Sequence, residues 1–196
     1  MKRNVTTTTL MVLAIAGFSG AMLRAIGAEG QDAAGAAAQK KTRIDRGAYL
    51  VGMMGCNDCH TPWKMGPKGP EPDMSRALTG HPENLKMPPA PQLPEGPWVA
   101  VIGATQTAWS GPWGVSFTAN LTPDKETGLG DWTEDMFIKT MRTGLHQGKG
   151  RPILPPMPWS MIGKLTDNDL KDVFAYLQSL PPVKNRVPAP VDPTER

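Results

Sequence analysis

The chain has few of the residues that usually bind metals. Its 196 residues include two cysteines, Cys56 and Cys59, and three histidines. A structural zinc site needs four Cys or His ligands, so it could form here only if His81 and His146 converged on the two thiols. A thioredoxin-like redox dithiol normally lies in a βαβ pattern, and the sequence shows none. Both the zinc and the dithiol interpretation of the cysteines are therefore disfavoured.

The chain also lacks a strong charge of either sign. Its formal net charge is +3, and Lys2, Arg3 and Arg24 lie in the first 28 residues, which contain no acid. Removal of that segment would leave a net charge of zero. Proteins that bind nucleic acid or anionic lipid carry a strong basic field. The composition therefore predicts no nucleic-acid partner, and docking would depend on local charges and apolar surface.

No apolar run reaches the usual length of a membrane span. Leu10 to Ile26 is 17 residues long and includes Arg24, which is short for a spanning helix. Lys2 and Arg3 before this run and small residues after it predict a signal peptide over residues 1–28, with an uncleaved anchor as the alternative. No cysteine lies near this segment, which excludes a lipoprotein anchor. Either form predicts export, with the bacterial periplasm as the compartment and membrane contact only through an uncleaved anchor.

The most specific motif is Cys56-Asn57-Asp58-Cys59-His60. Thiols three positions apart can both form thioethers with the two vinyl groups along one edge of a porphyrin. His60 follows directly, so attachment would place its imidazole beneath the iron as an axial ligand. We therefore predict one covalently bound haem c, held by Cys56 and Cys59 and ligated by His60.

Helical periodicity predicts an all-α domain with three main helices around the haem. The first would begin near Thr42, after a flexible lead-in over residues 29–41 that is rich in Ala, Gly and Gln, and would deliver Cys56 to the haem. Gly47 and Gly52 weaken this helix locally. They also allow another element to approach its backbone closely.

The other two helices have clear end signals. The second begins after Thr133, a good N-cap, and ends at Gly144. The third begins after Thr166, which forms a capping-box-like start, and stops before Pro181. Its apolar stripe comprises Leu170, Val173, Phe174, Leu177 and Leu180. That stripe predicts a helix packed against the core.

Residues 62–130 contain 12 prolines and 9 glycines, a density that forbids long helices. Large aromatic side chains that need burial lie in the same stretch: Trp63, Trp98, Trp109, Trp113 and Phe117. A large cofactor would provide that burial, so we expect an ordered, loop-rich insertion that wraps the haem. Residues 98–102 and 105–109 have strand-like patterns and could pair as a short hairpin.

The chain resembles class I cytochromes c over about residues 42–187. The resemblance rests on the helix before Cys56–His60, the loop Ile153–Trp159 and the closing helix Thr166–Leu180. Asn120–Asp124 and Gly128–Gly130 also resemble the cytochrome subunits and modules of periplasmic alcohol and gluconate-type dehydrogenases. The resemblance implies the cytochrome c fold for this domain, which would leave residues 188–196 as a C-terminal tail.

In this family a methionine from a loop before the last helix ligates the second face of the iron, and Met157 matches that position. Prolines around Met157 fix a non-helical backbone and leave few states to lose on ligation. A thioether favours Fe(II), so ligation by His and Met raises the reduction potential. Met161, His146 and His81 remain as alternatives for the second ligand.

These features predict an electron-transfer protein and not an enzyme. With His60 and Met157 on the iron, the chemistry would be one-electron exchange between a periplasmic dehydrogenase and a downstream cytochrome or terminal oxidase. One alternative is a dedicated haem subunit of a dehydrogenase complex. Another is a haem enzyme or gas sensor with an open distal site.

Overall fold

The computed structural model describes residues 16–195, which divide into two compact units with the boundary between Thr42 and Arg43. The charged start of the expected signal peptide, and part of its apolar run, lie outside the described residues. Within the described range, no helix is both long and apolar enough to cross a membrane.

The first helix, α1, begins earlier than the sequence suggests. It spans Ala16–Met53, so residues 29–41 are helical, and the expectation of a flexible lead-in is wrong. Thr42 is not a cap, because its hydroxyl donates to the carbonyl of Ala38 one turn earlier, as in the interior of a helix. The physical reason is the alanine content of this stretch, because alanine has the highest helix propensity and offsets the cost of scattered glycines.

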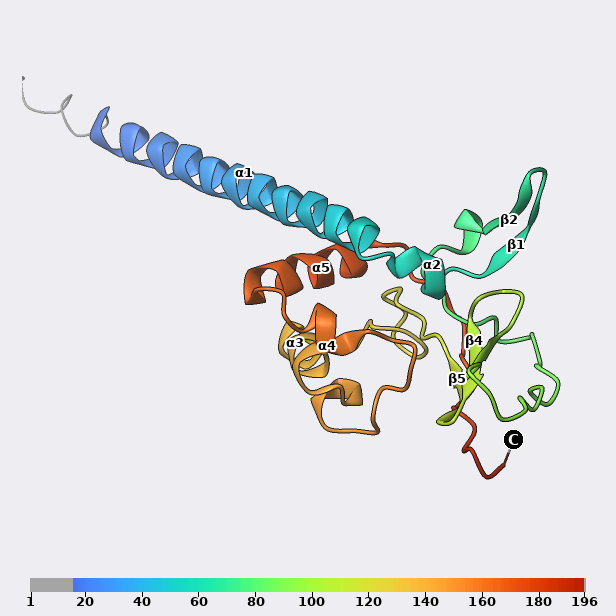
Figure 1. Cartoon of the computed structure of the whole chain (residues 1–196). Helices are drawn as coiled ribbons and strands as arrows, with labels where there is room; N and C mark the ends of the chain where they lie inside the picture. The colour runs from blue at the N-terminus through green and yellow to red at the C-terminus, as the bar shows by residue number, and fades with distance from the viewer. Residues whose placement is uncertain (1–15, 196) are drawn as a thin grey trace, which may run out of the picture. The chain divides into compact units, whose positions relative to one another are not determined.

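Four more helices follow in the described chain: α2 (Cys56–His60), α3 (Glu134–Thr143), α4 (Trp159–Ile162) and α5 (Asp167–Ser179) (Figure 1). The expected end signals are confirmed. The hydroxyl of Thr133 accepts from the backbone N–H of Met136, and that of Thr166 accepts from the N–H of Asp169. Gly144 ends α3 in the left-handed conformation, with φ 69°. These local signals set the boundaries of α3 and α5.

The Pro- and Gly-rich stretch contains two small antiparallel sheets, so the all-α description is wrong for this part of the chain. The strands are β1 (Trp63–Gly66), β2 (Gly69–Pro72), β3 (Val101–Ile102), β4 (Ala108–Gly111) and β5 (Gly114–Phe117). The same stretch contains a short 3₁₀ helix, η1 (Met74–Arg76), and a second one, η2 (His146–Gly148), follows α3. The expected hairpin is present as β3–β4, with Ile102 opposite Trp109, and β5 adds a third strand that was not expected.

Both tight hairpins close on the same four-residue pattern, Gly-Pro-x-Gly. In β1–β2, Gly66 pairs with Gly69, and in β4–β5, Gly111 pairs with Gly114. Gly69 and Gly114 have positive φ values of 121° and 95°, which L-residues rarely adopt. Proline at the first central position fixes a negative φ there, and a positive-φ glycine directly after the central residues is typical of hairpins built on a type I turn. This repeated pattern is therefore the signal that predicts these strands.

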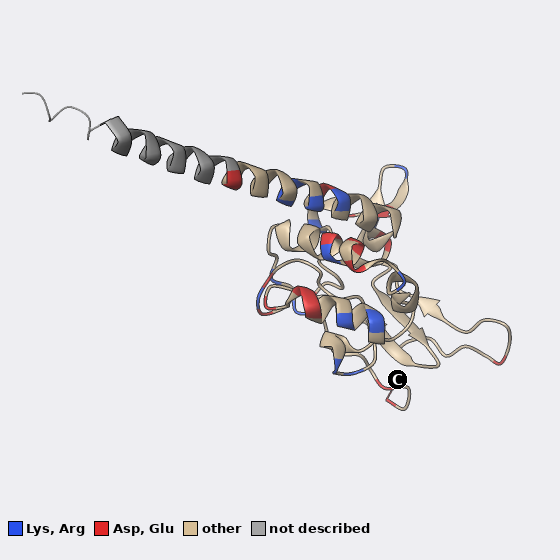
Figure 2. Cartoon of the chain, turned by 90° about the vertical axis from the view of Figure 1, so that its left-hand side faces the viewer, with Lys and Arg blue, Asp and Glu red and all other residues tan. Residues whose placement is uncertain are grey.

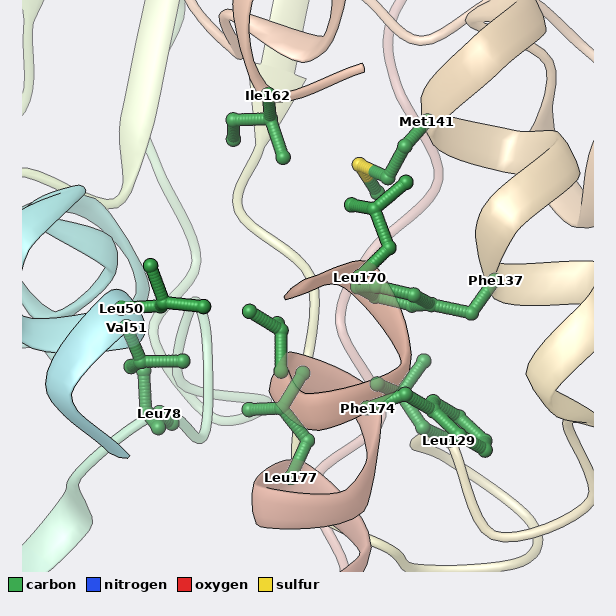
Figure 3. Close-up of a cluster of buried hydrophobic side chains, with 11 residues drawn as sticks. Leu50, Val51, Leu78, Leu129, Phe137, Met141, Ile162, Leu170, Phe174 and Leu177 are labelled. Carbon is green, nitrogen blue, oxygen red and sulfur yellow. The ribbon is translucent and has the colours of Figure 1, made fainter. Parts of the chain in front are cut away.

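The core of the second unit is built around α5. Its members are Leu50, Val51, Leu78, Leu129, Phe137, Met141, Ile162, Leu170, Val173, Phe174 and Leu177. Figure 3 shows the α1 residues Leu50 and Val51 on one side of α5 and the α3 residues Phe137 and Met141 on the other. The rings of Phe137 and Phe174 pack with centroids 5.4 Å apart. The apolar stripe expected on the last helix is thus buried, except for Leu180, which is partly buried.

Ion pairs join the C-terminal turns of α1 to α3 and α5. Figure 2 marks the basic positions on these turns of α1 in blue. Arg43 donates to Asp172 and to Glu134, each at 2.9 Å, and Arg46 donates to Asp169, also at 2.9 Å. The hydrogen bonds to Glu134 and then to Asp172 raise the pKa of Arg43. Because these side chains are partly exposed, each pair contributes little on its own, and the apolar contacts provide most of the stability.

Burial of the aromatic residues in the insertion is incomplete. Trp98 is 78% exposed, so the expectation that all these rings are buried is wrong for this residue. It lies in an irregular stretch, residues 91–99, in which every residue is exposed. Prolines prevent this segment from forming a helix or strand that could cover the ring. The ring of Trp63 is better held, because its Nε1 donates to the carbonyl of Asp58 at 3.0 Å.

Candidate haem site

The two thiols lie on a single helical turn. Gly55, in the left-handed conformation with φ 65°, separates α1 from α2 and lets α2 start directly at Cys56. Residues i and i+3 share a helix face, so Cys56 and Cys59 lie on the same side of α2. The structure pairs neither thiol in a disulfide. A common face for two free thiols is what attachment to one porphyrin edge requires.

Burial raises the pKa of both thiols, that of Cys56 to about 11. Redox-active and metal-binding cysteines have lowered pKa values, because the thiolate is the reactive form. The environment of Cys56 and Cys59 therefore argues against a redox dithiol. Within the described residues, no group of three or more His, Cys, Asp or Glu side chains could hold a metal ion. In this part of the chain, His81 and His146 thus do not converge on the thiols to form the four-ligand set that a structural zinc site needs.

His60 is held in an orientation that suits a metal ligand. Its side chain is buried, and its Nδ1 lies 2.8 Å from the carbonyl oxygen of Ala119. Burial lowers the pKa of His60, which favours the neutral imidazole. Because a carbonyl can only accept, the proton resides on Nδ1 and the lone pair remains on Nε2. Histidines that ligate metals typically donate their other N–H in this way.

Gly80 makes this arrangement possible, and the sequence alone did not single it out. Its N–H donates to the backbone carbonyl of His60 at 2.8 Å. Its φ is 77°, and a β-carbon at this position would lie 2.6 Å from the carbonyl carbon and oxygen of Ala119. Only glycine therefore lets the segment around Ala119 approach His60. The two thiols and the Nε2 of His60 together fit a covalently attached haem.

Met157 lies in the irregular loop between η2 and α4. Its side chain is partly buried and packs against the core cluster. The loop is fixed by Ser116, whose hydroxyl donates to the carbonyl of Pro155 at 2.6 Å. Met161, within α4, is 58% exposed. Of these two methionines, only Met157 therefore packs against the core.

The two other histidines are differently placed. His81 is fully buried, with Nδ1 2.9 Å from the hydroxyl of Thr107 and Nε2 3.0 Å from the carbonyl of Leu85. Both of its ring nitrogens are therefore used within the protein. His146 begins η2 and has an exposed side chain, and its ring meets that of Trp132 edge-on at 5.2 Å.

The motif around Asn120 folds a tight turn beside Ala119. The Oδ1 of Asn120 accepts from the N–H and the hydroxyl of Thr122, and the carboxylate of Asp124 accepts from Thr127. Gly128 passes so close to the carbonyl of Thr122 that a β-carbon would overlap it. This turn places the backbone of Ala119 next to α2, which gives the motif a direct role at the site.

Comparisons with known proteins agree with this geometry. The sequence model of the cytochrome c family matches residues 44–181. A stretch of 78 residues is 37% identical to a nicotinate dehydrogenase subunit of Pseudomonas putida, over 40% of this chain and 6% of that protein. A stretch of 89 residues is 34% identical to the fructose dehydrogenase cytochrome subunit of Gluconobacter japonicus, over 42% of this chain and 18% of that protein.

A longer match of 148 residues is 27% identical to the cytochrome c subunit of the quinone alcohol dehydrogenase of Gluconobacter oxydans, over 75% of this chain and 23% of that protein. The chain thus spans less than a quarter of the length of each of these three relatives. The family match itself covers α2, α3, α4 and α5. This chain therefore belongs to the cytochrome c family and carries a covalently bound c-type haem.

Proposed function

We propose that the protein is a periplasmic monohaem electron carrier, which transfers single electrons between a dehydrogenase and a downstream cytochrome or terminal oxidase. One observation carries this proposal. Two thiols share one face of α2, and the histidine that directly follows them, His60, donates its Nδ1–H to the carbonyl of Ala119. The haem, when bound, supplies one-electron chemistry at iron. The domain that would do this work is residues 42–187.

In this proposal Cys56 and Cys59 would anchor the macrocycle through thioethers, and His60 would bind the iron through its Nε2. Met157 would ligate the opposite face. A neutral, soft thioether favours Fe(II), which raises the reduction potential relative to ligation by two nitrogens. With both axial positions filled, no substrate can reach the iron. The protein would then act by electron transfer, without catalysis at the metal.

Three observations support Met157 over its alternatives. The side chain of Met161 is largely exposed. The ring nitrogens of His81 are both engaged, and a ligand must have a free nitrogen lone pair. His146 is exposed and packs on Trp132. Met157 alone among these four combines partial burial in the core with a donor atom suited to Fe(II).

The choice of partner rests on the relatives. Their names describe subunits of nicotinate, fructose, gluconate and alcohol dehydrogenases. We propose that a dehydrogenase is also the electron donor for this chain. The alternative is that the chain is a permanent haem subunit of such a complex, which the word "subunit" in those names favours. The location we propose is the periplasm, because the thioethers and the expected signal over residues 1–28 both suit an exported protein.

Purification from the native host followed by a redox titration tests the function. We expect a single reversible one-electron transition, monitored by the optical spectrum of the haem, from a protein that elutes as a small species. Elution with a large catalytic chain, stable in high salt, would establish the subunit alternative. A protein that turns over a substrate at its iron would contradict both forms of the proposal.

A further inference from the structure

The chain beyond α5 crosses the segments that hold His60. Pro181 and Pro182 prevent the helix from continuing, and residues 181–191, here called the C-terminal strap, run on in irregular conformation. The strap ends beside the second sheet, where Val191 pairs with Val115. Because a segment without regular structure must satisfy its backbone elsewhere, the contacts of the strap show what it is fastened to.

Asn185 is the most connected residue of the strap. Its Nδ2 donates to two backbone carbonyls, that of Thr79 at 2.7 Å and that of His81 at 2.9 Å. Its Oδ1 accepts from the N–H of Glu83 at 2.8 Å. Its own N–H donates to the hydroxyl of Thr127 at 3.0 Å. All polar groups of this one amide side chain are thus directed at residues 79–83.

A second asparagine fastens the strap from the other side. The Nδ2 of Asn120 donates to the carbonyl of Val183 at 2.8 Å, and the N–H of Val183 donates to the hydroxyl of Thr122 at 3.1 Å. Asn120 directly follows Ala119, whose carbonyl accepts from His60. The strap therefore contacts both chain segments that lie against the imidazole.

The two segments are also joined to each other. The N–H of His81 donates to the carbonyl of Thr118 at 2.9 Å, and the N–H of Leu121 donates to the carbonyl of Leu78 at 2.8 Å. These bonds enclose Gly80 and Ala119, the residues in direct contact with His60. The carbonyls held by Asn185 belong to the residues on either side of Gly80. The side chain of Asn185 thus holds residues 79–81, the backbone segment that packs against Ala119 beside His60.

We propose that Asn185 is a positioning residue for the iron ligand His60, and this inference rests on the proposed function. By holding residues 79–81 against Ala119, it keeps the carbonyl of Ala119 in line with Nδ1–H. A strong hydrogen bond at Nδ1 makes Nε2 a better donor, and this stabilises Fe(III) and lowers the reduction potential. The C-terminal strap therefore tunes the redox site from outside the helical core.

The test compares Asn185→Ala with Lys184→Ala in the full haem-loaded protein. Lys184 is the adjacent strap residue, and its side chain forms a surface ion pair with Glu126 at 2.8 Å. Exchange of the Nδ1 proton of His60 is measured by NMR in the ferrous protein with ¹⁵N-labelled histidine. Loss of well-made hydrogen bonds should speed this exchange roughly fivefold or more in Asn185→Ala and leave it unchanged in Lys184→Ala. The reduction potential of Asn185→Ala should rise.

Asn185→Asp provides a second variant if the alanine variant does not fold. It keeps an oxygen for the N–H of Glu83 but loses both donated bonds, so exchange at Nδ1 should again become faster. If the variants that fold are less stable than the wild type yet keep its exchange rate and its reduction potential, the strap only stabilises the fold and the inference is wrong. If wild-type spectra show that His60 does not bind iron, the proposed function itself fails, and the two failures are thereby separated.

Discussion

Gly47 packs directly against the carbonyl oxygen of Asp172, leaving no room for a β-carbon between α1 and α5. The same hypothetical carbon would lie 2.7 Å from the Cβ of Tyr176. The sequence predicts that another element approaches the first helix closely at Gly47 and Gly52. This close approach is confirmed at Gly47. It is absent at Gly52, where a β-carbon would meet nothing within 4 Å.

This difference gives a matched pair of variants. Gly47→Ala should lower the free energy of unfolding by about 1–3 kcal/mol, because the overlap is with backbone that must move. Gly52→Ala should be neutral or stabilising by about 0.5–1 kcal/mol, because alanine is favoured over glycine inside a helix. Guanidinium denaturation of the two haem-loaded variants measures both values. Equal effects at the two positions would show that α1 and α5 do not cross at Gly47.

Phe174 tests the core itself. Its side chain is 7% exposed and packs on Phe137. Phe174→Ala should cost about 3–5 kcal/mol in unfolding free energy, because it removes buried area and leaves a cavity. Asn168→Ala, at an exposed position of the same helix, should change stability by less than about 0.5 kcal/mol. A loss below about 1 kcal/mol for Phe174→Ala would place α5 at the periphery of the fold.

Asp73 predicts a specific acid sensitivity. Its carboxylate accepts from Ser75 at 2.7 Å, from Lys64 at 3.1 Å and from Arg76 at 3.0 Å. These hydrogen bonds hold the pKa of Asp73 well below its usual range, and the bond from Ser75 has the largest effect on that pKa. The carboxylate therefore stays ionised in the folded protein at pH values where the unfolded chain binds a proton. Its stabilising effect is complete above the ordinary Asp pKa of about 3.9 and is lost as the pH falls below it.

Asp73→Asn should consequently be less stable than the wild type at pH 7, and the difference should shrink as the pH falls below the ordinary Asp pKa of about 3.9. Unfolding free energies measured from neutral to strongly acidic pH give the comparison. A gap that stays constant with pH would show that the hydrogen bonds of Asp73 do not depend on its charge.

The mass of the native protein tests attachment and export together. Covalent haem on Cys56 and Cys59 should survive acid–acetone extraction and add the mass of one haem to the chain. The signal expected over residues 1–28 should be absent, with the mature chain beginning near Glu29 and found in the periplasmic fraction. Haem that extracts freely would refute the thioethers, and an intact Met1 in a membrane pellet would favour an uncleaved anchor.

Sequence reasoning works where the signal is local. Thr133 and Thr166 cap their helices through residues three positions away, so the ends of α3 and α5 could be predicted. The attachment motif is likewise contiguous. The hydrogen bond from Asn185 to Thr79 joins residues 106 positions apart, and that from His60 to Ala119 joins residues 59 apart. No spacing rule predicts such pairs, since tertiary packing alone brings them together.

Other features escape prediction although a signal is present. The hairpins β1–β2 and β4–β5 follow from the repeated Gly-Pro-x-Gly turns, because the residues that break helices also form hairpin turns. The early start of α1 follows from the high helix propensity of alanine.

The exposure of Trp98, by contrast, had no signal in the sequence, because the burial of a ring depends on which segments fold over it.

Binding of CO to the ferrous protein shows whether Met157 and His60 together close both faces of the iron. The wild type should exclude CO, because both axial positions are filled. Met157→Ala should keep its haem, bind CO and show a lower reduction potential, whereas Met161→Ala should behave like the wild type. If the wild type binds CO readily, or if Met157→Ala excludes it while Met161→Ala, His146→Ala or His81→Ala admits it, this account of the site is contradicted.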